Sequence, residues 1–184
     1  MKNDRDILCR LKFEFKPETI RNMTPQSLTL LESAYDFQGG NMNAKYLVGI
    51  YLVFNGNEPQ RGLQLIEGCD NYSTRLRQYV YAMARIKVDK DDSVAVDMLY
   101  SMFHNFYVED REWVKNLMCR RQFRRMLQDD KWSTLKTTTL CLNSRHGRRW
   151  NREVETIRRG VEYQYSCLDC RIDIETFKLA NNIE

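Results

Sequence analysis

The chain has 184 residues, of which 42% are hydrophobic and 29% are charged, and its formal net charge is +4. This composition is typical of a soluble globular protein with a sizeable core and excludes an intrinsically disordered chain. No run of about 18 apolar residues is present, and the first residues lack the apolar core of a secretory signal, so we expect a cytoplasmic or nuclear protein.

The N-terminal segment, residues 1–23, shows no clear regular pattern. Its stretch ILCRLKFEF fits either a short strand or the start of a helix, and Pro17 interrupts any regular pattern that follows. Thr24 followed by Pro25 is a helix start signal, because an N-cap residue precedes a proline at the first helical position. Leucines at helical spacing follow, and Gly39-Gly40 is expected to end this first helix.

Further helices are predicted up to residue 130. They cover AKYLVGIYLVF, QRGLQLIEGCD, STRLRQYVYAMARIKV, DDSVAVDMLYSMFHNFYV and EDREWVKNLMCRRQFRRMLQDD. Gly56 and Pro59 separate the first two, and Asp91-Asp92-Ser93 and Glu109-Asp110 supply capping oxygens for the last two. No stretch alternates with the period of a strand, so the predicted fold class is all-α, with a helical domain over residues 24–130.

Part of this domain repeats. A shift of 35 residues aligns SLTLLESA with GLQLIEGC, and it aligns three residues of the next helix, Tyr46, Val48 and Gly49, with Tyr81, Met83 and Ala84. The small residue in each set would let stacked helices approach closely. Two interpretations remain, a short solenoid of helix pairs and a chance similarity between amphipathic helices. The solenoid, which we favour, would offer a surface for a protein or peptide, with Lys45, Arg75 and Arg77 as candidate contacts.

The C-terminal annex, residues 131–184, contains a cluster of metal-ligand residue types. Cys141, His146, Cys167 and Cys170 form the pattern C-x4-H-x20-C-x2-C. Tetrahedral zinc accepts three thiolates and one imidazole, and the two-residue gap lets both cysteines of a pair reach one ion. Three interpretations stay open, namely a structural zinc site, buried structural cysteines, and a redox dithiol of the kind usual in α/β folds. We expect a small irregular annex.

The remaining cysteines are interpreted differently. In a reducing compartment a disulfide framework is not expected. Cys9, Cys69 and Cys119 are therefore predicted to be small buried apolar residues.

Several stretches resemble known families. NAKYLVGIYLVFNGNEPQRGLQLIE is similar to a Sel1-like repeat, a relative of the tetratricopeptide repeat. LLESAYDFQGGNMNAKYLVGIYLVF and CLDCRIDIETF resemble the helical region and the cysteine-containing tail of a group of plant F-box proteins, over Leu28 to Phe177. The resemblance implies a substrate-recognition part of a ubiquitin ligase. No F-box is recognisable, so a Skp1-type adaptor is an expected partner only if a docking segment is supplied elsewhere.

Enzyme signatures are not found. The patterns G-x-G-x-x-G, G-x-x-x-x-G-K-[ST], H-E-x-x-H and G-x-S-x-G are absent from the sequence. His104 lies among aromatic residues and is interpreted as a core or boundary residue rather than a general base. The acid pairs Asp91-Asp92 and Asp129-Asp130 are interpreted as helix caps and loop residues. We therefore expect a non-catalytic protein.

Residues 116–160 contain 12 Lys and Arg against 4 Asp and Glu. The alternative function is therefore a nucleic-acid-binding protein that uses the basic stretch from Arg120 to Arg159 beside the zinc annex. In the other interpretation these arginines line solvated helix faces and cover apolar surface with their stems. Trp132 and Trp150 are expected either to pack within the annex or to anchor a partner. We favour a protein partner.

Overall fold

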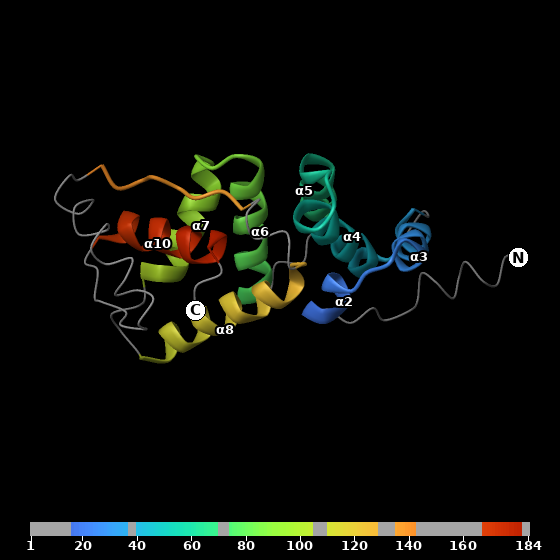
Figure 1. The fold of residues 1–184 in the computed structure, drawn as a ribbon, viewed down its shortest axis with the longest axis horizontal. Coiled ribbons are helices and arrows are strands. Elements are labelled where there is room, and N and C mark those ends of the chain that lie inside the picture. Colours follow the sequence, from blue (N-terminus) through green and yellow to red (C-terminus); the bar gives the residue numbers. More distant parts are fainter. Residues whose placement is uncertain are drawn as a thin grey trace, which may run out of the picture.

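A computed structural model of the chain describes residues 16–36, 40–69, 74–104, 110–128, 135–142 and 167–181 (Figure 1). These residues contain helices and no strand, which confirms the predicted all-α fold class. The helices are α2 (Pro17–Arg21), α3 (Pro25–Tyr35), α4 (Met42–Phe54), α5 (Pro59–Glu67), α6 (Arg75–Val88), α7 (Ser93–His104), α8 (Asp110–Met126) and α10 (Leu168–Ala180).

Short-range capping contacts start several of these helices. Thr24 caps α3, since its Oγ1 accepts a hydrogen bond from the Ser27 N–H at 3.2 Å while its own N–H donates to Ser27 Oγ at 2.8 Å. Asp92 caps α7 by accepting from the Ala95 N–H at 2.8 Å, as predicted. Pro17 begins α2, so the interpretation that it interrupts regular structure is wrong. A proline is tolerated there because the first N–H of a helix has no intrahelical acceptor.

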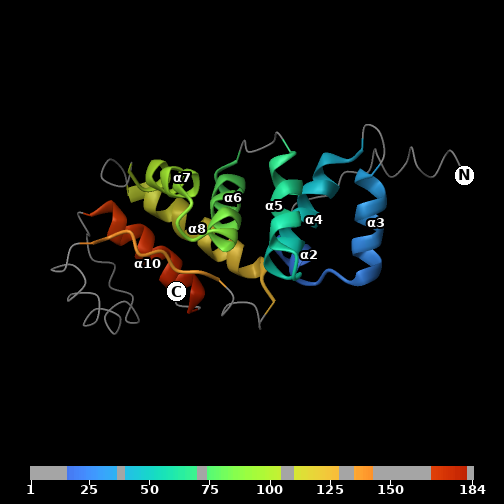
Figure 2. The same cartoon turned by 90° about the horizontal axis from the view of Figure 1, so that it is seen from above.

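Helices α3, α4, α5 and α6 each pack against the next helix in the chain (Figures 1 and 2). The backbones of α4 and α5 approach closely where Gly49 faces Gly62. A methyl group added to Gly49 would lie 2.9 Å from the Gly62 carbonyl oxygen, and one added to Gly62 would lie 2.6 Å from the Gly49 carbonyl oxygen. The predicted need for a small residue at position 49 is therefore confirmed, while the solenoid repeat stays a prediction.

Helix α8 brings together helices that are not consecutive in the chain. It contacts α2 and α6, and the Phe123 ring meets the rings of Phe54 and Tyr79 edge-on, with centroids 4.8 and 5.8 Å apart. Asn55, the buried C-cap of α4, donates from Nδ2 to the Met126 carbonyl at 2.8 Å. Helices far apart in the sequence thus share one core.

Helix α10 is buried on several sides. It packs against α7, and residues 135–142, which have no regular secondary structure, run beside it (Figures 1 and 2). Its buried residues are Cys170, Ile172, Asp173, Ile174, Glu175, Thr176, Lys178 and Leu179. The prediction of an irregular annex is therefore wrong for Leu168–Ala180. The predicted domain boundaries at residues 23 and 131 stay predictions.

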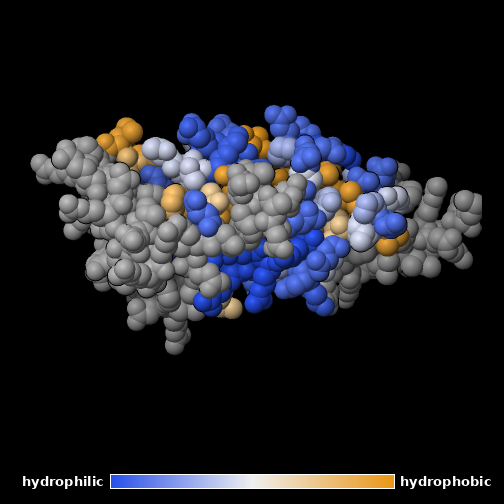
Figure 3. All heavy atoms as spheres, in the orientation of Figure 1, coloured by the Kyte–Doolittle hydropathy of each residue, from blue (hydrophilic) through white to orange (hydrophobic). Residues whose placement is uncertain are grey.

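Three further expectations concern the single cysteines, the polarity of the surface and membrane-spanning helices. Cys69 and Cys119 are buried, as predicted, whereas Cys9 lies outside the described residues. Hydrophilic side chains dominate the face in Figure 3, and its apolar side chains are scattered among them. No helix in the described part of the chain is both long and apolar enough to cross a bilayer.

Candidate metal centre

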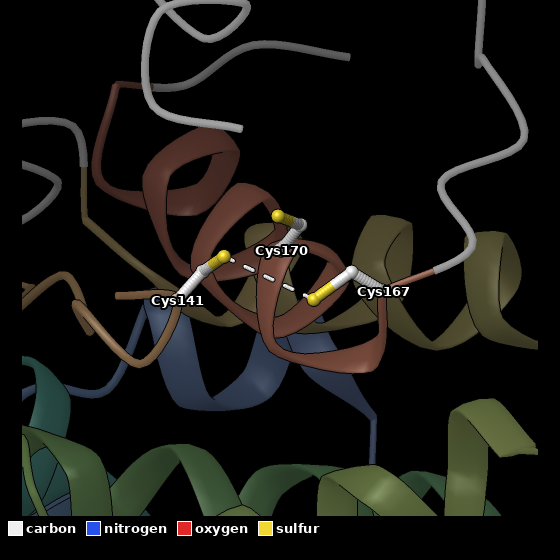
Figure 4. A group of neighbouring side chains, drawn as sticks. All are labelled: Cys141, Cys167 and Cys170. Carbon is white, nitrogen blue, oxygen red and sulfur yellow. Dashed lines mark hydrogen bonds between the residues drawn. The ribbon is translucent and has the colours of Figure 1, made fainter. Parts of the chain in front are cut away.

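Three cysteines meet at the N-terminal end of α10 (Figure 4). Cys167 is the N-cap of this helix and Cys170 lies in its first turn, while Cys141 comes from the segment beside it. The three sulfur atoms all lie within 4.8 Å of one another, and the Sγ atoms of Cys141 and Cys167 are 3.9 Å apart. Three of the four predicted ligands are thus brought together. The fourth, His146, lies outside the described residues.

The separation of one pair of sulfurs, those of Cys141 and Cys167, suits a single ion. Zinc–sulfur bonds of about 2.3 Å in a tetrahedral arrangement place neighbouring sulfurs about 3.8 Å apart. The 3.9 Å between the sulfurs of Cys141 and Cys167 is close to this value. All five cysteines of the described residues are present as thiols, and their sulfurs remain available as ligands in the cluster.

Burial affects the three thiols unequally. Cys170 is buried, whereas Cys141 and Cys167 are half-buried. Burial raises the pKa of the Cys170 thiol well above its ordinary value, and hydrogen bonds with the neighbouring thiols raise it further. A cation bound by all three sulfurs would reverse this effect, because its charge stabilises the thiolates.

A row of side chains on α10 faces the segment that carries Cys141. The row consists of residues 167, 170, 173 and 176, which recur at a spacing of three and therefore lie near one another along the helix. Thr176 Oγ1 accepts a hydrogen bond from the Thr138 N–H at 3.1 Å. The row thus attaches the segment 135–142 at its middle as well as at the cysteines.

Asp173 makes most of these attachments. Its Oδ1 accepts from Thr138 Oγ1 and from the Leu140 N–H, both at 2.8 Å, and its Oδ2 accepts from the Cys141 N–H at 3.0 Å. Asp173 and Thr176 were not predicted from the sequence as residues of the site. The available signal was an acid and a threonine that continue the three-residue spacing of the cysteine pair.

A second buried cluster lies where α8 meets α10. The Arg120 guanidinium donates to both carboxylate oxygens of Glu175, from Nε at 2.7 Å and from Nη2. Arg120 and Arg124 are each 7% exposed. The interpretation that the arginines of the basic stretch line solvated faces is therefore wrong for these two, although Arg121 and Arg125 are exposed.

The candidate partner contacts Lys45, Arg75 and Arg77 bridge neighbouring helices. Their side chains donate hydrogen bonds at 3.3, 2.7 and 3.2 Å to oxygen atoms of Gly68, Met102 and Asn43, respectively. All three are partly buried. These side chains therefore have structural roles within the described helices.

An open pocket of about 520 Å³ lies between the start of α5, the end of α6 and the segment 135–142. Its charged lining residues are Glu58, Arg61, Lys87 and Lys136, a local excess of positive charge. Lys136 also donates from Nζ to the Val88 carbonyl at 2.8 Å, which links the segment to the end of α6.

The acid pairs, His104 and the two tryptophans named in the sequence analysis have structural roles or lie outside the described part. Asp92 pairs with Arg85 at 2.9 Å in addition to capping α7. The side chain of His104, together with Asp129, Asp130, Trp132 and Trp150, lies outside the described residues.

Comparisons with known proteins add no assignment. No family model matches the chain, and no curated protein or solved structure matches it. The resemblance to Sel1-like repeats and to plant F-box proteins therefore stays a prediction. On the described geometry, this chain is an all-α protein with a three-cysteine cluster that could hold a metal ion.

Proposed function

We propose that this chain is a non-catalytic protein-interaction module in which a structural zinc ion fastens residues 135–142 to α10. The observation that carries this proposal is the approach of three cysteine sulfurs to within 4.8 Å of one another. Thiolates are ligands that zinc binds well, and they are common in its structural sites. His146 is the proposed fourth ligand, which would complete a Cys3His set.

The sequence separation of the ligands favours a structural role for the ion. The ion would join Cys141 to Cys167, which are 26 positions apart. Such a link stabilises the folded state because it removes conformational freedom that the open chain would have. A set of four protein ligands also leaves no open position for a reactive water molecule, in contrast to catalytic zinc. The described carboxylates of Asp92 and Glu175 are engaged in ion pairs with arginines, which also favours a structural role for them.

The metal centre and the basic pocket share one segment. Lys136 lines the pocket, and Cys141 lies five residues further along the same segment. A metal ion at Cys141 would therefore help to hold one wall of the pocket in place. Arg61 pairs with Glu58 and Glu32. The excess of positive charge in the lining therefore comes from Lys87 and Lys136, and it favours a partner that presents acidic side chains.

The resemblance to plant F-box proteins suggests a biological setting. In that setting the module would select a substrate for ubiquitylation. A Skp1-type adaptor would then be reached through a docking segment supplied elsewhere. This assignment rests on the quoted motifs alone, and the metal and pocket proposals do not depend on it.

Metal analysis of the full chain, purified without chelator, tests the metal site. We expect about one zinc per chain in the wild type and a loss of zinc in Cys141→Ser, Cys167→Ser and Cys170→Ser. Cys69→Ser is the matched control, because Cys69 is buried outside the cluster and a hydroxyl can still donate to the Leu65 carbonyl. Markedly substoichiometric zinc in the wild type would contradict the proposal. His146→Ala tests the fourth ligand separately.

Binding of a labelled glutamate-rich peptide tests the pocket. We expect Lys87→Glu to weaken binding, because it reverses a charge in the pocket lining. Lys90→Glu makes the same change of charge at an exposed residue that does not line the pocket, and it should have little effect. A labelled single-stranded RNA serves as the comparison. Binding of RNA but not of peptide, with a steep dependence on salt, would favour the nucleic-acid alternative.

A further inference from the structure

The carboxylate of Asp173 bridges two successive backbone N–H groups next to the cysteine cluster. It accepts from Leu140 at 2.8 Å and from Cys141 at 3.0 Å. We propose that Asp173 is the positioning residue of the metal centre, because it sets the backbone of Cys141 so that its sulfur meets those of α10. This inference rests on the proposed metal site.

The first argument is the local backbone. Each of the two N–H groups has its own oxygen of the carboxylate, Oδ1 for Leu140 and Oδ2 for Cys141. Successive N–H groups that converge on one anionic group form a concavity of the kind that binds anions. This pair of contacts fixes the orientation of the backbone at residues 140 and 141, and with it the direction in which the Cys141 side chain leaves the backbone.

The second argument is which elements of the fold carry the three cysteine ligands. Cys167 and Cys170 belong to the same end of α10, so the helix fixes their relative positions. Cys141 is the one ligand of the described cluster that comes from a segment without regular structure. The position of Cys141 therefore depends on the contacts that side chains of α10 make with this segment. Leu142, the next residue, is 91% exposed, so the contact with Asp173 lies at the end of the docked part of the segment.

The third argument is the burial of the Asp173 carboxylate and the set of hydrogen bonds that it accepts. Asp173 is 6% exposed and accepts three hydrogen bonds, two from backbone N–H groups and one from Thr138 Oγ1. A buried carboxylate with this set of donors has a defined orientation. Partners that orient metal ligands in this way commonly change metal affinity by about 10- to 100-fold when they are removed.

The variant Asp173→Asn separates positioning from general docking. In either orientation of the new amide, its nitrogen faces the N–H group of Leu140 or that of Cys141, so that one donor opposes another. The variant thus loses one of the two backbone contacts that hold the chain at Cys141.

Thr176→Val is the matched control. Thr176 is buried and holds the same segment through the Thr138 N–H, further from the cysteines. Valine has a similar shape but cannot accept this bond. The variant should lower stability while the contact between Asp173 and Cys141 remains, so its metal affinity should stay close to that of the wild type.

Titration of the full chain with Co²⁺, followed by the thiolate-to-metal absorption band, measures the affinity. We expect Asp173→Asn to bind Co²⁺ about 10- to 100-fold more weakly than the wild type, and Thr176→Val to bind within about threefold. Equal affinity in Asp173→Asn and the wild type would overturn the positioning role. Equal weakening in both variants would overturn it too, because Asp173 would then act only through docking. No cobalt–thiolate band in the wild type would instead overturn the metal site itself.

A second readout needs no metal. A short thiol-bridging reagent applied to metal-free, reduced protein reports whether Cys141 lies near Cys167, since their sulfurs are 3.9 Å apart. We expect a clearly lower yield of the Cys141–Cys167 bridge in Asp173→Asn than in Thr176→Val, with the bridged peptides identified by mass spectrometry. Equal yields would show that Asp173 does not position Cys141.

Discussion

The hydroxyl group of Tyr79 donates a hydrogen bond to Glu175 Oε1 at 2.5 Å, although the two residues are 96 positions apart. Arg120 Nε donates to the same oxygen at 2.7 Å. Tyr79 is fully buried, and Glu175 and Arg120 are 3% and 7% exposed. One carboxylate therefore connects α6, α8 and α10, and it joins the helix that carries two cysteines of the cluster to the main helical body.

Replacing this carboxylate should destabilise the fold strongly. We expect Glu175→Gln to lower the free energy of unfolding by about 3–5 kcal/mol, because Arg120 keeps its charge in a buried site without a carboxylate partner. Urea denaturation at pH 7 measures the change. Glu32→Gln is the control, since Glu32 pairs with Arg61 at 3.1 Å in a much more exposed position. This variant should lower the free energy of unfolding by at most about 1 kcal/mol. A similarly small loss for Glu175→Gln would rule out an important buried ion pair.

The same carboxylate should contribute to the dependence of stability on pH. Burial alone would raise the pKa of Glu175, but the charge and hydrogen bonds of Arg120 and the hydrogen bond from Tyr79 outweigh it, and the pKa lies below its ordinary value. A lowered pKa means that the stabilisation is present above the unfolded pKa of about 4.3 and is lost as the pH falls through the folded value. The stability difference between wild type and Glu175→Gln should therefore shrink below about pH 4.3. Urea denaturation from pH 7 to pH 3 tests this, and a constant difference would contradict it.

The close approach of α4 and α5 should not tolerate a methyl group. In Gly62→Ala the new Cβ would lie 2.6 Å from the Gly49 carbonyl oxygen and 2.8 Å from the Val53 nitrogen, both of them backbone atoms. We expect a loss of about 1–3 kcal/mol in the free energy of unfolding, because the helices must separate. In Gly68→Ala the new Cβ would meet the end of the Lys45 side chain, which can move aside. That variant should stay within about 0.5 kcal/mol of the wild type.

Chelation should lower stability if zinc occupies the cysteine cluster. A ligand that binds only the folded state stabilises it by about 2.7 kcal/mol at a free concentration of 100 times its Kd. We therefore expect a chelator to lower the unfolding midpoint of the wild type and of Cys69→Ser. The midpoint of Cys141→Ser should be low already and should not respond to chelator. Thermal unfolding followed by circular dichroism makes this comparison, and equal chelator responses in all three proteins would contradict a zinc site at Cys141.

The elements that could be predicted from the sequence have short-range causes. The starts of α3 and α7 follow from Thr24 and Asp92, whose capping partners lie three residues away. The separation of α4 from α5 follows from Gly56 and Pro59, which are unfavourable within a helix. The cysteine pair of α10 was recognised by its two-residue gap. Each of these signals is contained within a few neighbouring residues.

Other features depended on distant partners. Helix α10 was not predicted, because Asp173, Glu175 and Lys178 interrupt its apolar pattern and charged residues ordinarily indicate an exposed face. Arg120 was assigned to a solvated surface for the same reason.

The amino-acid sequence by itself therefore determined the all-α class, most helix starts and three cysteines suited to one ion. Only the tertiary structure decided that Cys141 meets Cys167 and Cys170, and that Asp173 and Glu175 are buried. The physical reason is the cost of removing a charge from water. That cost is offset only by donors that the folded chain brings from elsewhere, among them the N–H groups of residues 140 and 141 and the guanidinium of Arg120.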